Sequence, residues 1–244
     1  MIKRISALVL LGVLLVASLP SRAGNSDIAL PSGFGQTTFN TLVEELGTAV
    51  AYNSVAPAES MGITGFDLGV VVGGVELDTT VWDQVVSDGS APSSLIVPKL
   101  LVRKGLPFGI DLGVSYTAVP DSNVTILGGE VRKSLLEGST VMPAISLSFH
   151  TSSLDGVDDL DISTYGFDVG ISKGFAMFTP YASVGQIWLD GSENSTLLTL
   201  QDYDDSMTRS SVGVKIGFMP IMSLTLQADM AETNSYNMKL SLDF

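Results

Sequence analysis

The sequence predicts an all-β fold, and we interpret it as a single closed barrel of about ten antiparallel strands. Three observations predict the all-β fold, while the choice of a barrel rests on the signal peptide, the aromatic end and the loop lengths described below. Apolar and polar residues alternate with a period of two along most of the chain, glycine is frequent while charge is modest, and the chain ends on such an alternating segment. Successive side chains of a strand point to opposite faces, so residues 234–244 have one apolar and one polar face. The apolar positions of this last segment are Tyr236, Met238, Leu240, Leu242 and Phe244.

Residues 1–23 are predicted to be a secretory signal peptide that is removed. Lys3 and Arg4 form a basic start, 5–19 is an apolar run, and small residues precede the expected cut after Ala23. A retained anchor is the alternative. Without this segment the chain has nine basic and 26 acidic residues, a net charge of −17, which argues against nucleic-acid binding. The chain has no cysteine, which excludes disulfides and thiol catalysis.

The alternation divides the rest of the chain into ten predicted strands. They lie near 62–77, 94–104, 107–118, 123–135, 139–151, 161–173, 177–190, 207–219, 221–232 and 234–244. The second, fourth and seventh alternate least regularly, and Pro98 in the second indicates a strand end or a bulge. Each strand has roughly the 9–11 residues that a tilted strand needs to cross a bilayer.

An amphipathic last strand with an aromatic final residue, behind a secretory signal, resembles the closing strand of Gram-negative outer-membrane barrels. The resemblance implies that residues 236–244 are the assembly signal read by the barrel-assembly machinery, and that Phe244 is periplasmic. The strand connections at that end are then short, and three of the five at the other end are long, as expected of such barrels. An even strand number brings both termini to the periplasm. A soluble sandwich of two sheets is the alternative.

Residues 24–60 are predicted to be a separate helical segment in front of a barrel formed by 61–244. Apolar residues recur there at helical spacing, and Pro57 lies beyond the end of the helix. The stripe consists of Phe39, Leu42, Val43, Leu46 and Val50. We expect the helix at the periplasmic mouth, where the first strand begins, either lying across the mouth or entering the lumen as a plug.

Charged residues recur on the polar face of the strands, which a membrane barrel turns toward its lumen. These residues are Asp67, Asp111, Glu130, Arg132, Asp168, Lys215, Asp229, Lys239 and Asp243, with Arg103 added from the second strand. Buried charges must be paired or solvated, so we expect a network of salt bridges. A polar solute path lined by acids is the alternative reading.

His150, the one histidine of the chain, shares a strand face with Ser152. This spacing resembles the lipid A deacylase barrels, in which a base activates a hydroxyl nucleophile. Asp155, Asp158, Asp159 or Asp161 would orient the ring. A His-x-Ser spacing also occurs by chance. The omptin proteases share the number of strands, but the chain lacks their Asp-x-His pattern.

Acidic residues gather in the predicted outer loops, where carboxylates suit Ca²⁺ or Mg²⁺. The metal candidates are Asp155, Asp158, Asp159, Asp202, Asp204 and Asp205. None of these runs has the spacing of the twelve-residue calcium loop, so a solvated acidic rim is the alternative. Divalent cations at this surface would also bridge lipopolysaccharide.

Residues 40–70 resemble the entry segment of FadL-type transporters, in which a helix and an Asn-Pro-Ala-like turn precede the first strand. Here Asn53 and Pro57 are separated, and the chain is shorter than that family's barrel. The sequence therefore predicts a non-enzymatic, structural or narrow-pore barrel of the Gram-negative outer membrane, in contact with its lipid and without a cofactor. The alternatives are passive uptake of a small hydrophobic solute gated by the helix, and a lipid-modifying hydrolase that uses His150 and Ser152.

Overall fold

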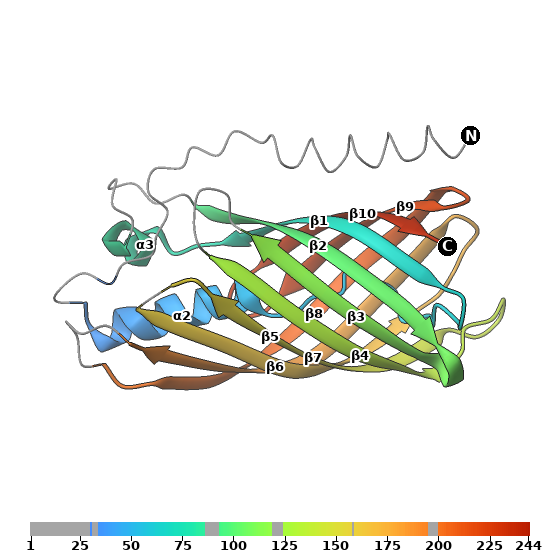
Figure 1. Ribbon diagram of the computed structural model, residues 1–244. Helices are drawn as coiled ribbons and strands as arrows, with labels where there is room; N and C mark the ends of the chain where they lie inside the picture. The colour runs from blue at the N-terminus through green and yellow to red at the C-terminus, as the bar shows by residue number, and fades with distance from the viewer. Residues whose placement is uncertain (1–29, 31–33, 86–92, 119–123, 158, 195–199) are drawn as a thin grey trace.

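The computed structural model describes residues 30, 34–85, 93–118, 124–157, 159–194 and 200–244, whose strands form one closed barrel (Figure 1). Each strand pairs antiparallel with its sequence neighbours, and β1 completes the ring with β10. The strands are β1 (Phe66–Glu76), β2 (Ser94–Leu106), β3 (Ile110–Ala118), β4 (Thr125–Leu136), β5 (Ala144–Asp155), β6 (Leu160–Ser172), β7 (Phe178–Glu193), β8 (Tyr203–Met219), β9 (Met222–Met230) and β10 (Ser235–Asp243). The predicted ten-stranded antiparallel barrel is confirmed. The predicted signal peptide lies outside the described residues.

The ring closes where the first strand begins and the last one ends. The Phe66 N–H donates to the Phe244 carbonyl at 2.6 Å, the Phe244 N–H donates back at 2.9 Å, and the two rings stack with centroids 5.3 Å apart. We call this the carboxy-terminal end of the barrel and the opposite end the loop end. The pairing then continues along β1 as far as Val75, which lies opposite Ser235.

Connections at the carboxy-terminal end are the 3-10 turn η1 (Pro107–Gly109) and residues 137–143, 173–177 and 220–221. The predicted strand 139–151 was placed too early: β5 begins at Ala144, because Ser139 and Met142 close a turn (N–H to carbonyl 2.9 Å) and Pro143 has no N–H. Residues 77–93 and 194–202 are long connections at the loop end. The predicted loop 152–160 is reduced to 156–159, because β5 and β6 extend further than the alternation indicated.

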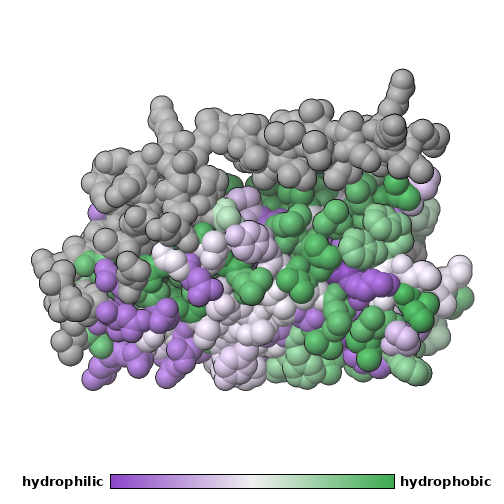
Figure 2. Space-filling model, viewed as in Figure 1, coloured by the Kyte–Doolittle hydropathy of each residue, from purple (hydrophilic) through white to green (hydrophobic). Residues whose placement is uncertain are grey.

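The outer face of the barrel is apolar over the part nearer the carboxy-terminal end. Figure 2 shows hydrophobic residues gathered there and hydrophilic residues at the loop end. Of the predicted terminal pattern, Tyr236, Met238, Leu240 and Phe244 are 58%, 50%, 45% and 62% exposed. Such an outer surface suits lipid, and the closed ring leaves no unpaired strand edge in it. The protein is a transmembrane β-barrel. None of the helices in the described part of the chain is long and apolar enough to span a bilayer.

The loop half of the lumen is apolar, in contrast to the other half. Here the strands turn apolar side chains inward and polar ones, such as Thr208 and Gln186, outward. The inward residues of this half are Val75, Val97, Val124, Ile126, Leu154, Leu160, Ile162, Ile187, Leu189 and Met207. This half therefore has a hydrophobic core, like a soluble protein, whereas the other half has a polar interior.

Helix α2 (Gln36–Val50) occupies this apolar half (Figure 1). The predicted stripe is buried: Phe39, Leu42 and Val43 are 0% exposed, Leu46 is 3% and Val50 is 1%. Burying each such side chain contributes roughly 1.5–3 kcal/mol. The expectation that the helix lies at the mouth where β1 begins was wrong. The helix lies at the opposite end, because the lumen presents apolar side chains there.

Two glycines let the helix approach the wall closely. A Cβ atom on Gly47 would lie 2.5 Å from Leu189 Cδ1, and one on Gly191 would overlap Val43. A second helix, α3 (Thr79–Val85), which the sequence analysis did not predict, covers α2 from the loop between β1 and β2. The plug is thus held between the barrel wall and this loop.

Candidate functional site: the plugged lumen

Residues 51–65, which we call the thread, join α2 to β1 and run through the polar half of the lumen. Near the helix, the Tyr52 carbonyl accepts a hydrogen bond from Arg209 Nη1 at 2.9 Å. Near the carboxy-terminal end, the Met61 N–H donates to Asp111 Oδ1 at 3.2 Å. Tyr52 and Val55 are 1% and 0% exposed. Helix and thread together therefore fill the barrel from one end to the other.

Arg132 contacts the thread through both of its terminal nitrogens. Its Nη1 donates to the Pro57 carbonyl at 2.7 Å, and its Nη2 donates to Ser54 Oγ at 2.5 Å. The same guanidinium is paired with Glu130 Oε1 at 2.9 Å. The planar donor fork of arginine holds the thread while its charge stays neutralised by the wall.

Asp229 is surrounded by neutral donors, one of which comes from the thread. Asn53 Nδ2 donates to its Oδ2 at 2.9 Å, and the Asn53 Oδ1 accepts from Gln227 Nε2 at 2.8 Å. Four further bonds reach the carboxylate, from Ser211 (2.5 Å), Gln227 (2.6 Å), Ser235 (3.1 Å) and Asn237 (2.7 Å). A carboxylate has about four acceptor sites, so Asp229 is saturated.

The structure places all nine predicted lumen charges, and Arg103, on inward-facing positions. Eight of the nine join ion pairs between wall residues. The pairs are Arg103 with Asp111 and Glu130 (3.6 Å each), Arg132 with Glu130 (2.9 Å), and Arg209 with Asp168, Lys215 with Asp243 and Lys239 with Asp67 (2.9 Å each). Asp229 is the exception.

The thread adds almost no charge to this network. Its one charged residue is Glu59, which is exposed. The buried wall cations that hold it, Arg132, Arg209 and Lys239, each have a carboxylate partner in the wall. Leaving a buried charge unpaired costs several kcal/mol, but withdrawal of the thread would not break any of these pairs. The wall can therefore hold the thread or release it without losing its own charge balance.

Polar contacts fasten the helix at the loop end. Glu45 is 6% exposed and accepts from the Asp78 N–H at 2.8 Å and from Trp82 Nε1 at 2.5 Å. The Tyr203 hydroxyl donates to Glu44, and Gln36 exchanges two hydrogen bonds with the Gln201 backbone, at 2.9 and 2.8 Å. The loops on both sides of the barrel mouth thus bind the plug.

The structure does not bring His150 and Ser152 together as a base and a nucleophile. His150 Nε2 lies 3.0 Å from Asp168, while Ser152 Oγ donates to the Val50 carbonyl at 2.7 Å and meets Thr164 Oγ1 at 2.8 Å. The carboxylate beside the ring is Asp168, so the expectation of Asp155, Asp158, Asp159 or Asp161 was wrong for the described residues. Asp158 lies outside them. Ser152 serves instead to fasten the end of α2.

The acidic metal candidates are not gathered into one cluster. Across the described ranges, no group of three or more His, Cys, Asp or Glu side chains is placed to hold a metal ion. Asp205 Oδ2 lies 2.8 Å from the Tyr203 hydroxyl, and Asp204 lies opposite Asp190 across β7 and β8. Asp158 lies outside the described residues.

The sequence analysis missed four residues that shape the lumen: Lys99, Arg209, Tyr52 and Trp82. Lys99 and Arg209 lie on the inward phase of β2 and β8, in step with Arg103 and Ser211, so the alternation contained this signal. Tyr52 and Trp82 carried no such signal, because their positions depend on where the thread and α3 meet the wall.

No family model matches the chain, and no curated protein matches it. Solved structures share the barrel. The KdgM porin has 9% identity and a TM-score of 0.36, covering 73% of this chain and 99% of its own. The N-terminal barrel of Pseudomonas aeruginosa OprF has 11% sequence identity and a TM-score of 0.35, and the match covers 73% of this chain and 97% of that one. Yersinia pestis Ail has 10% identity and a TM-score of 0.34, with 74% of this chain and 99% of that one covered. At these values the likeness adds nothing to what the closed strand order shows by itself.

Replacing Arg132 with glutamine should loosen the thread, because Ser54 and Pro57 lose their donors and Glu130 loses one of its two cations. Removing one partner of a buried pair costs about 3–5 kcal/mol. We expect faster hydrogen–deuterium exchange of the thread amides in detergent-solubilised protein. Lys133→Gln is the control, since Lys133 is the next residue of β4 and points outward. Equal thread protection in both variants would contradict the role of Arg132.

Proposed function

We propose that this protein is an outer-membrane barrel that its own amino-terminal segment keeps closed: a structural barrel at rest, and a narrow pore when that segment moves. The observation that carries the proposal is the combination of α2 in the apolar half and the thread in the polar half. Together they leave no stretch of the lumen empty of the chain. The ion pairs of the wall do not involve the described part of the segment, which supports a plug that can be released.

We further propose that the carboxy-terminal end is periplasmic and the loop end faces outward. The long connection 77–93, the acidic residues at the ends of β7 and β8, and the polar outward side chains there support this orientation. The proposed partners are outer-membrane lipid and lipopolysaccharide at the outer face, with divalent cations at the outer loops, and the assembly machinery at β10. In this orientation the start of α2 faces the cell exterior, in contrast to the expectation that 24–60 is periplasmic.

Single cysteines report this orientation, because the chain has none of its own. Thr37 is exposed at the start of α2, and Glu59 is exposed near the carboxy-terminal end. In intact cells a membrane-impermeant maleimide should label Thr37→Cys and not Glu59→Cys, while both react after lysis. Labelling of Glu59→Cys alone would show that the carboxy-terminal end faces outward and would contradict the proposed orientation.

Planar-bilayer recordings test whether the segment closes the pore. The refolded mature chain should be silent, and a variant without residues 24–60 should conduct steadily. Leu42→Asp provides a full-length counterpart, because a charge at this buried position prevents α2 from packing. Both variants must first show the heat-shifted gel band of a folded barrel. Steady conductance of the unmodified chain, or silence of both folded variants, would refute the closed-plug model.

Uptake of a small hydrophobic solute is a second candidate function, in line with the likeness of residues 40–70 to FadL-type entry segments. One observation favours it. If α2 moved, the apolar side chains that now surround it would line a chamber open to the loop end. Such a chamber would take an apolar molecule from outside, whereas the polar half would pass it poorly unless the thread also moved.

A disulfide between α2 and β7 tests this alternative. A Cβ atom built on Gly191 lies 3.3 Å from Val43 Cβ, close to the separation that a disulfide spans. We expect oxidised Val43→Cys/Gly191→Cys to block uptake of a small apolar fluorescent dye by cells, and a reductant to restore it. Val43→Cys alone is the control. Uptake that is unaffected by oxidation would exclude a gating role for the helix.

A further inference from the structure

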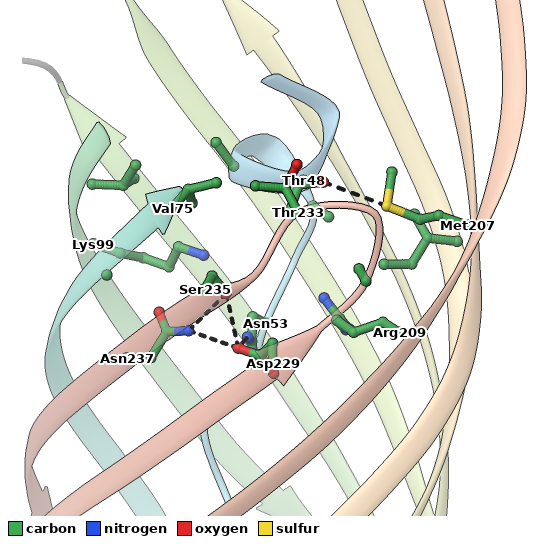
Figure 3. A pocket seen from close by; sticks show the side chains of 16 residues that line it. Thr48, Asn53, Val75, Lys99, Met207, Arg209, Asp229, Thr233, Ser235 and Asn237 are labelled. Carbon is green, nitrogen blue, oxygen red and sulfur yellow. Dashed lines mark hydrogen bonds between the residues drawn. The ribbon is translucent and has the colours of Figure 1, made fainter. Parts of the chain in front are cut away.

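A cavity of about 30 Å³ lies inside the barrel where α2 meets the thread (Figure 3). The carboxy-terminal turn of the helix forms one wall, through Thr48 and Ala49, and the thread contributes Asn53. Residues of β1, β2, β9 and β10 line one side, and Ile187 of β7 with Met207 and Arg209 of β8 line the other. The cavity reaches Thr233 in the turn between β9 and β10, so it is accessible from the loop end. Its size admits about two water-sized particles.

Lys99 is the unusual residue of this cavity. It is 9% exposed, and in Figure 3 its amine points into the cavity. Among the residues that the structure describes, it has neither a hydrogen bond nor an ion pair. The Lys99 ammonium opens into the cavity, so its hydrogen-bond partner must be whatever occupies the cavity.

The two described wall charges of the polar half that are not in ion pairs both lie at this cavity. In the polar half of the lumen, the described wall residues include six carboxylates and six lysine or arginine side chains, and five of each are joined in direct ion pairs. Lys99 and Asp229 remain, and both line this cavity. Asp229 keeps its negative charge, but its two oxygens accept five hydrogen bonds from neutral donors and none from Lys99.

Other groups around the cavity determine what Lys99 can bind. Arg209 lines the opposite wall, and its buried Nε has no hydrogen-bond partner among the described residues. The carboxy-terminal end of α2 also faces the cavity, but its partial charge of about −0.5 offsets only part of the lysine charge. Two cationic side chains, each with a donor that no described residue accepts from, thus line one small cavity whose carboxylate already accepts five hydrogen bonds.

We propose that this cavity binds a small monovalent anion, such as a halide, between Lys99 and Arg209. The anion accepts hydrogen bonds from the Lys99 ammonium, for which the described residues provide no acceptor. Because the cavity touches both the end of α2 and Asn53 of the thread, the bound anion holds the junction of the plug in place. This inference concerns a binding site and does not depend on whether the barrel conducts.

Chloride-35 NMR of the full mature chain in a non-ionic detergent tests the site. The unmodified protein should broaden the chloride line in a saturable way, nitrate should reverse the broadening, and gluconate, which is too large for the cavity, should not. Lys99→Met should lose the saturable broadening. Lys215→Met should keep it, because Lys215 is a lumen lysine already paired with Asp243. Broadening that survives in folded Lys99→Met, or none in the unmodified protein, would overturn the proposal.

Bromide-soaked crystals of the unmodified protein give an independent answer if Lys99→Met does not fold. An anomalous peak beside Lys99 would support the site. An ordered cavity that contains water without such a peak would overturn it.

Discussion

The pairing of β1 with β10 is the constraint on which the rest of the molecule depends. A bilayer offers no hydrogen-bond partner to a strand edge, so the sheet must close on itself, and closure fixes which side chains face inward. The ring then encloses a space that its own wall does not fill. The amino-terminal segment fills that space, and its two parts match the two kinds of wall: an amphipathic helix against apolar side chains, and a nearly uncharged thread against polar ones.

The wall satisfies its charges before the thread is counted. Pairs such as Lys239 with Asp67 and Arg209 with Asp168 are complete within the strands, and the same cations reach the thread through its carbonyl and hydroxyl oxygens. The thread thus binds as a neutral ligand, through hydrogen bonds that water could replace. The helix differs, because its removal would expose the apolar core of the loop half to water.

The barrel could be predicted from the sequence because a two-residue period survives wherever one strand face meets lipid. The helix could be predicted equally well from the apolar stripe between Phe39 and Val50. Its location in the barrel could not, because the surface that it packs against is formed by inward-facing residues of many strands. The irregular alternation of the second, fourth and seventh strands was the available signal: Val97, Ile126 and Leu189 lie there, turned toward α2. The neighbour of His150 could not be predicted, because Asp168 becomes adjacent only through the register of β5 and β6.

The thread passes through a ring that its own chain later closes. Phe34, next to the start of α2, packs in the apolar loop half, whereas β1 starts at the opposite end. Because β10 is the last strand of the chain, it can pair with β1 only after all the other strands have been synthesised. A helix about 10 Å across could not be drawn through a finished, side-chain-filled ring of this size. In the full-length chain the strands therefore close around a helix that already lies between them.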